Sequence, residues 1–173
     1  MVEKVSYKIL KRFDDVEIRK YPKIIIAVVE GYEGDSGFNL LFSYISGSNK
    51  TKKQIQMTAP VITSEKIPMT APVISKKDYM AFVLPSSYDE ESVPVPTNSE
   101  INIKNQPEKT LAVLRFSGKT SRKQVEKQIE KLLEILKNNK IQIIDDPILM
   151  RYNSPFAPGF LRRNEVAVEI KNG

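Results

Sequence analysis

The chain has 173 residues, of which 40% are hydrophobic and 28% charged, and these values are typical of one globular domain. It contains no cysteine and no histidine, which excludes disulfides, thiolate metal sites, histidine-based catalytic triads and a histidine ligand to haem iron. The formal net charge of +6 favours anionic partners, namely acidic small molecules, nucleic acid or a lipid surface, although plain solubility also accounts for such a balance.

The sequence shows no segment typical of a membrane span. The apolar run from Ile24 to Val29 has six residues, far fewer than the roughly 20 that cross a bilayer as a helix. The first residues lack the apolar stretch of a signal peptide. We therefore expect a cytoplasmic, monomeric protein that folds as a single domain over residues 1–173.

Alternating apolar residues predict a β-hairpin over residues 5–21, followed by a third strand over about residues 24–32. Asp14 and Asp15 supply the turn of the hairpin. These three strands open the first half of the chain.

A helix is predicted next, because four apolar residues recur at the i, i+3, i+4 and i+7 positions of one helix face. We expect Asp35 or Ser36 to cap its first turn and Gly47 to end it in a left-handed conformation. The apolar face consists of Phe38, Leu41, Phe42 and Ile45.

An internal repeat follows the helix: the hexapeptide at residues 57–62 recurs at residues 69–74. This short spacing predicts two antiparallel strands joined by a turn near residues 63–66. Pro60 and Pro72 cannot donate to a ladder, so they indicate sheet edges or bulges.

The second half repeats the order of the first. A long loop rich in proline and serine covers residues 85–99. A second helix is predicted over residues 121–139, with Ser121 as its cap. Strands are predicted over residues 78–84, 101–105, 110–116, 148–152 and 165–170.

Each half therefore contains strands, then a helix, then further strands. Two such halves predict an α+β fold with a pseudo-twofold antiparallel sheet or barrel and two helices packed outside it.

Three motifs give the chain a family resemblance that extends from about residue 5 to residue 170. In combination they are specific, and the chain resembles the SOUL family of haem-binding proteins. The motifs are Tyr7-Lys8-Ile9 with Val16-Glu17-Ile18-Arg19-Lys20-Tyr21, the repeated Met-Thr-Ala-Pro-Val, and Arg162-Arg163-Asn164-Glu165-Val166.

The resemblance implies a distorted β-barrel of about eight strands with two flanking helices, similar to gyrase-inhibitor-like effector-binding domains. It also implies a shallow apolar groove beside the first helix, covered by a loop near the C-terminus. Where family members carry basic residues around this groove, the present chain has Asp35, Ser43 and Ala157. The ligand-binding residues that we expect are Phe38, Leu41, Phe42, Ile45, Phe156, Phe160, Leu161 and Arg162.

We expect no dedicated metal site, and haem is the cofactor that the resemblance suggests. Without histidine, the iron ligands left open are the thioethers of Met57 and Met69 and the phenolate of Tyr44. The alternative reading is that these side chains fill the core. Arg162 and Arg163 are candidates for binding carboxylates, unless they pair with Glu165 instead.

These features predict non-catalytic binding of haem or another tetrapyrrole. The alternative is an effector-binding or protein-interaction domain that uses the same groove for an organic cation or a peptide, with haem binding lost. No aromatic residue accompanies the lysine clusters at residues 50–53 and 76–77, so we expect no specific nucleic-acid binding. Glu165 is the acidic group considered for acid or base chemistry, which we do not expect.

Overall fold

The computed structural model describes residues 2–32, 34–51, 64–153 and 157–171. One sheet of ten strands runs in the order β2-β3-β10-β12-β11-β6-β7-β4-β9, with β1 beside β6. Its strands are β1 (Glu3–Lys4), β2 (Lys8–Phe13), β3 (Val16–Tyr21), β4 (Ile24–Glu30), β6 (Thr70–Lys76), β7 (Tyr79–Val83), β9 (Asn102–Gln106), β10 (Lys109–Phe116), β11 (Ile148–Arg151) and β12 (Asn164–Glu169). The other elements are α1 (Asp35–Ile45), α2 (Arg122–Asn138), the 3₁₀ helix η1 (Gly159–Leu161), and β5 (Asn49–Lys50) paired with β8 (Val95–Pro96).

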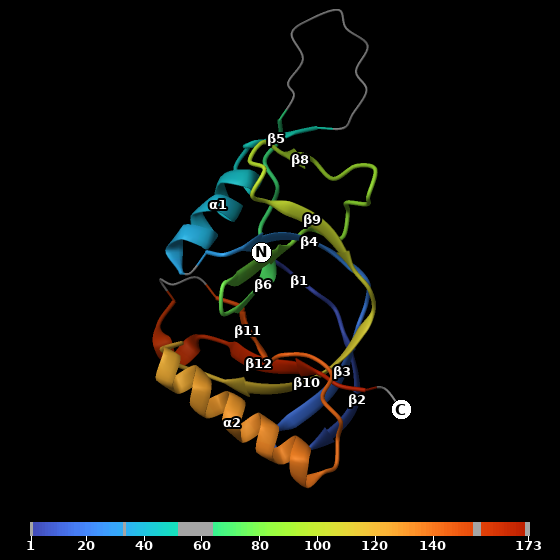
Figure 1. Cartoon of the computed structure of the whole chain (residues 1–173), viewed down its shortest axis with the longest axis vertical. Helices are drawn as coiled ribbons and strands as arrows, with labels where there is room; N and C mark the ends of the chain where they lie inside the picture. Colours follow the sequence, from blue (N-terminus) through green and yellow to red (C-terminus); the bar gives the residue numbers. More distant parts are fainter. Residues whose placement is uncertain (1, 33, 52–63, 154–156, 172–173) are drawn as a thin grey trace, which may run out of the picture.

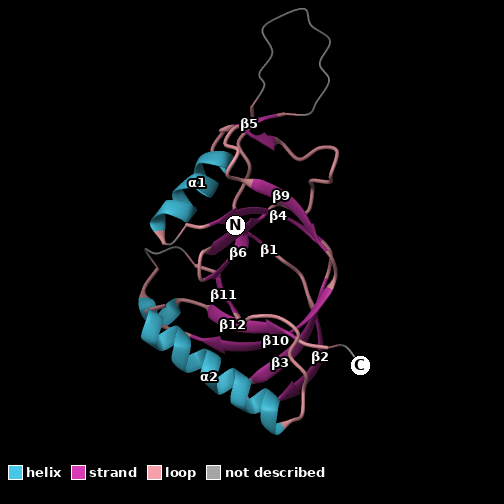
Figure 2. Cartoon of the chain, in the orientation of Figure 1, coloured by secondary structure: helices cyan, strands magenta, loops and turns pink. Residues whose placement is uncertain are grey.

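The two halves of the sheet are related by a pseudo-twofold arrangement. Outward from the central pair β6 and β11, the order is β7, β4 and β9 on one side and β12, β10 and β3 on the other. α1 follows β4, and α2 follows β10, which occupies the equivalent place. Figures 1 and 2 show α1 packed on one half and α2 on the other. The predicted α+β fold with two outer helices is confirmed.

The sheet curls like a barrel but does not close. Among the described residues, its edge strands β2 and β9 do not pair with each other. It has ten strands where about eight were expected, and β1 accounts for one of these with only two residues.

Buried side chains form three groups, one in each half and one between the halves. One lies between the outer face of β4 and β7 and the helix α1, and includes Leu41 and Phe82. A second lies under α2, where Leu132 and Leu136 are fully buried. The third fills the inside of the curled sheet and joins side chains of both halves. The strands β4, β7, β10 and β12 thus bury both of their faces, as expected of a strand between a helix and an inner core, whereas the edge strands β2 and β9 are mostly exposed.

The capping of α2 agrees with the prediction, whereas the N-terminus of α1 does not. Its N-cap is Gly34, and no side chain makes a capping hydrogen bond, so Asp35 and Ser36 do not act as caps. Gly47 has a φ of +131°, which suits its predicted place after the helix. In α2, Ser121 accepts a hydrogen bond from the backbone N–H of Gln124, as predicted.

The hairpin expected between the two copies of the repeat does not form at β6, which belongs to the second copy. β6 pairs with β7 on one side and with β1 and β11 on the other, so it has no free edge. The first copy, residues 57–62, lies outside the described residues. Pro72 lies within a register shift between Thr70 and Val73. This agrees with the bulge that was predicted because proline has no backbone N–H to donate to the ladder.

In the described parts of the chain, neither helix is long and apolar enough to span a membrane.

Candidate functional site

Three aromatic rings run from the core to the surface at α1. Phe82 is buried, and Phe38 meets it edge-on with ring centroids 5.2 Å apart. Phe42 stacks on Phe38 at 5.9 Å with an angle of 13° between the rings, and it is 50% exposed. The i, i+4 spacing on the helix aligns Phe38 and Phe42. The stacked pair forms an apolar aromatic surface that reaches solvent at Phe42.

A cavity of about 420 Å³ lies next to Phe38, where α1, β6 and β11 meet. We call it the α1 cavity. Its volume is within the usual range for small-molecule sites. Most of its wall is apolar, and few charged groups reach it. The lining residues are Val2, Gly34, Asp35, Phe38, Met69, Thr70, Ala71, Val73, Arg151, Tyr152 and Asn153.

Arg151 is the cation of the α1 cavity. Its Nε atom is buried and has no hydrogen-bond partner among the described residues. Burial lowers the pKa of this guanidinium, while the charge of Asp35 acts in the opposite direction. A half-buried guanidinium with an unmet donor favours a ligand that brings a carboxylate, because the planar fork matches that group. Sequence reasoning missed Arg151; the available signal was a cation at the end of an otherwise apolar strand.

The structure separates the predicted ligand-binding residues into three groups. Leu41 and Ile45 are buried under α1, so they support the site from behind. Phe38 lines the cavity, and Phe42 lies beside it at the surface. Two others project into solvent from η1, where Phe160 is 79% and Leu161 63% exposed. Arg162 donates through Nε to the Ala157 carbonyl at 2.9 Å. Phe156 lies outside the described residues.

The possible iron ligands also separate. Met69 lines the α1 cavity. Tyr44 is fully buried and donates its hydroxyl to the Pro94 carbonyl at 2.6 Å, which makes it a core residue. Met57 lies outside the described residues. Within the part of the chain that the structure describes, no group of three His, Cys, Asp or Glu side chains suits a metal ion.

A buried ion network occupies the inner face of the half of the sheet that contains β3, β10 and β12. Glu165 is fully buried and accepts hydrogen bonds from Arg19 at 2.9 and 2.7 Å and from Arg163 at 3.1 Å. The Arg163 guanidinium also lies 4.0 Å from the ring centroid of Tyr152. Arg19 and Arg163 therefore both pair with this carboxylate, which joins strands of the sheet.

The tyrosines around this network predict a loss of stability at high pH. Burial raises the pKa of Tyr21 to about 12, and it also raises the pKa of Tyr152. In the unfolded chain both ionise near pH 10. Their contribution is therefore complete below pH 10 and is lost as the pH rises toward 12. We expect the melting temperature to fall over this range; a melting temperature that stays constant between pH 10 and 12 would contradict this.

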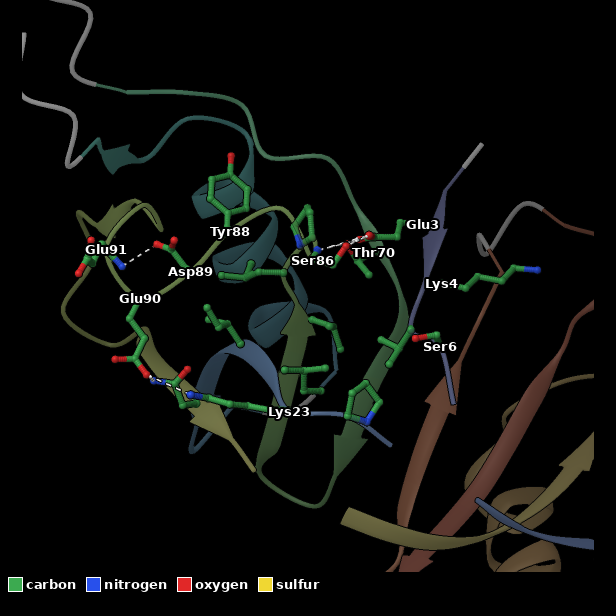
Figure 3. Close-up of a pocket in the computed structure, with 18 residues that line it drawn as sticks. Glu3, Lys4, Ser6, Lys23, Thr70, Ser86, Tyr88, Asp89, Glu90 and Glu91 are labelled. Atoms are coloured by element: carbon green, nitrogen blue, oxygen red, sulfur yellow. Dashed lines mark hydrogen bonds and ion pairs between the residues drawn. The ribbon is translucent and has the colours of Figure 1, made fainter. Parts of the chain in front are cut away.

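A second, larger hollow of about 960 Å³ lies between residues 3–6 and the segment 85–91. Its floor is apolar, but its rim carries Glu3, Asp89, Glu90 and Glu91. Figure 3 shows Glu3 beside Thr70 and Ser86, and Lys4 directed away from the hollow. Hydrogen bonds from Ser86 lower the pKa of Glu3, so its carboxylate is ionised at neutral pH. This rim disfavours an acidic ligand, which the α1 cavity suits better.

The chain is thus a two-lobed α+β domain with an apolar cavity beside its first helix. A family model described as SOUL heme-binding protein matches residues 2–169. The chain therefore belongs to the SOUL family. It is 33% identical to heme-binding protein 2 of Homo sapiens and 31% identical to that of Mus musculus, each over 164 residues that cover 90% of this chain and 78% of the relative.

Solved structures share the fold at much lower sequence identity. The EcmrR C-terminal domain is 9% identical, with a TM-score of 0.61 over 96% of this chain and 99% of that one. A structure described as a hydrolase from Listeria innocua is 12% identical, with a TM-score of 0.60 over 94% of both chains. At these identities the likeness concerns the fold alone.

Proposed function

We propose that this protein binds haem or a related tetrapyrrole at the α1 cavity without catalysing a reaction. The observation that carries the proposal is an apolar cavity lined by Phe38, whose ring stacks on the exposed Phe42, and by Arg151, whose Nε lacks a hydrogen-bond partner among the described residues. Membership of the SOUL family and the similarity to heme-binding protein 2 support the choice of ligand.

The residues present fit the chemical parts of such a ligand. The rings of Phe38 and Phe42 offer faces on which a macrocycle stacks, and Val73 continues the apolar wall. Arg151 holds a carboxylate of the ligand by charge-assisted hydrogen bonds. Phe160, Leu161 and Arg162, on and next to η1, are our prediction for the covering side.

Haem supplies a flat apolar ring, two carboxylates and an iron ion. The chain has no histidine, so the affinity comes mainly from ring contact and charge pairing. Among the described residues, the Met69 thioether is the candidate iron ligand, because it lines the cavity. If haem binds, this thioether would be the one cavity-lining sulfur among the described residues that could hold its iron.

Titration with haemin, with iron-free protoporphyrin and with the protoporphyrin dimethyl ester tests these roles by absorption spectroscopy. We expect saturable one-to-one binding of haemin and protoporphyrin. Phe38→Ala weakens both about tenfold or more, because it removes a stacking face worth a few kcal/mol. Arg151→Gln weakens the free acids about tenfold and leaves the ester unchanged.

Two controls keep the result interpretable. Phe42→Ala tests the stacking surface at an exposed position, where loss of the ring leaves the core intact. Ile144→Ala removes an exposed apolar side chain that does not line the cavity, and it has no effect. No saturable binding of any tetrapyrrole, or equal loss for acid and ester in Arg151→Gln, would overturn the proposal.

A further inference from the structure

The charge of this protein is concentrated in two segments. Residues 115–123 contain Arg115, Lys119, Arg122 and Lys123, residues 157–163 contain Arg162 and Arg163, and neither segment contains an acid. The whole chain has 27 cationic and 21 acidic residues, so the rest is balanced at 21 of each. The net charge of +6 therefore equals the charge of these two segments.

The two segments lie side by side in the fold. The backbone N–H of Gly118 donates to the Gly159 carbonyl at 2.9 Å, and the side-chain amide of Asn164 donates to the Gly118 carbonyl at 2.9 Å. Figure 1 shows the loop with η1, in red, against the first turn of α2. Lys119, Arg122 and Lys123 are exposed there. We call η1 together with these three cations the basic tip.

The basic tip also presents the most exposed large apolar side chains of the described chain. Phe160 is 79% and Leu161 63% exposed, on a rigid 3₁₀ turn closed by hydrogen bonds from Leu161 to Pro158 and from Arg162 to Gly159. Neither belongs to a buried core group. Two adjacent apolar residues exposed on a hydrogen-bonded turn indicate a site where a partner binds and covers them.

We infer that the basic tip docks on an anionic lipid surface. Phe160 and Leu161 enter the boundary between headgroups and acyl chains, while Lys119, Arg122 and Lys123 contact the phosphates of the headgroups. Nucleic acid would also satisfy the cations, but it offers no apolar layer for the Leu161 side chain, which has no ring on which a base can stack. The inference concerns the ligand-free chain and does not rest on the proposed function.

Sedimentation with vesicles tests this, comparing pure phosphatidylcholine with phosphatidylcholine that contains about one third phosphatidylserine. We expect binding to the anionic vesicles that weakens as salt is added. Replacing Phe160 and Leu161 together by serine lowers the partition coefficient at least tenfold. Replacing Lys119 and Lys123 by glutamine lowers it about fivefold per cation.

Matched controls use the same substitutions at exposed positions elsewhere. Val95→Ser with Ile144→Ser, and Lys8→Gln with Lys77→Gln, leave the partition coefficient within about twofold of the starting protein. Circular dichroism verifies that every variant is folded. The inference is overturned if the starting protein does not bind anionic vesicles, if the control pairs weaken binding as much as the tip pairs, or if the serine pair leaves binding unchanged. The vesicle experiment contains no tetrapyrrole, so a negative result does not bear on tetrapyrrole binding. A negative tetrapyrrole titration likewise does not bear on vesicle binding.

Discussion

Glu165→Gln is expected to lower the free energy of unfolding by about 3 to 5 kcal/mol, because it leaves buried cations without their counter-charge. Glu165 is fully buried, and Arg19 is only 2% exposed. Their bidentate pair joins β3 to β12, which lie on opposite sides of β10 in the sheet. The amide offers one acceptor where the carboxylate offered two, and it carries no charge. Urea unfolding followed by circular dichroism measures the loss.

The matched control is Glu134→Gln on α2, whose carboxylate is exposed. It changes the free energy of unfolding by less than about 0.5 kcal/mol. Glu17 also contacts Arg19, at 2.7 Å, and it compensates part of the loss. A loss below about 1 kcal/mol in Glu165→Gln would mean that Glu17 suffices for Arg19, and the buried pair would then not be a main source of stability.

Asn49→Leu is the second substitution with a large expected effect. Asn49 is 2% exposed and makes three hydrogen bonds: its amide donates to the carbonyls of Tyr44 and Glu65, both at 2.8 Å, and its oxygen accepts from the Glu65 N–H at 3.0 Å. Leucine fills the space but leaves the N–H and the carbonyl of Glu65 without these bonds, and the Tyr44 carbonyl keeps only the Gly47 N–H at 3.3 Å. We expect a loss of about 3 kcal/mol in thermal or chemical unfolding.

The comparison variant is Asn39→Leu, at an exposed position of α1. The chemical change is the same, and the expected effect is within about 0.5 kcal/mol. Equal effects at the two positions would contradict the role of Asn49. Its bonds fix the end of α1 to residue 65, a few residues before Met69, so the same substitution is also expected to loosen that wall of the α1 cavity.

Local pattern was sufficient to predict most elements of the fold. The helices α1 and α2 and the β2–β3 hairpin follow from patterns within one element or two neighbouring ones, and these predictions are confirmed. The strand pairing was harder, because it depends on partners far apart in sequence. The repeat at residues 69–74 suggested a hairpin with its other copy, whereas β6 takes its partners from both ends of the chain.

The candidate site was predictable only where its residues belong to one local pattern. Phe38 and Phe42 follow from the helix pattern, although that pattern does not separate them from Leu41 and Ile45, which face the core. Arg151 could not be assigned, because the cavity that it faces is made by β6 and α1, more than 70 residues earlier in the chain. Whether the expected residues bind a ligand stays a prediction.

The pairing of β3 with both β2 and β10 has a consequence for biosynthesis. The β2–β3 hairpin leaves the ribosome first, yet its partner β10 begins at Lys109 and β12 follows only at Asn164. Strands β4, β7 and β9 of the other half are all complete by Gln106. The half that starts the chain is thus the last to be finished, and during synthesis the nascent hairpin presents an unpaired strand edge to its surroundings.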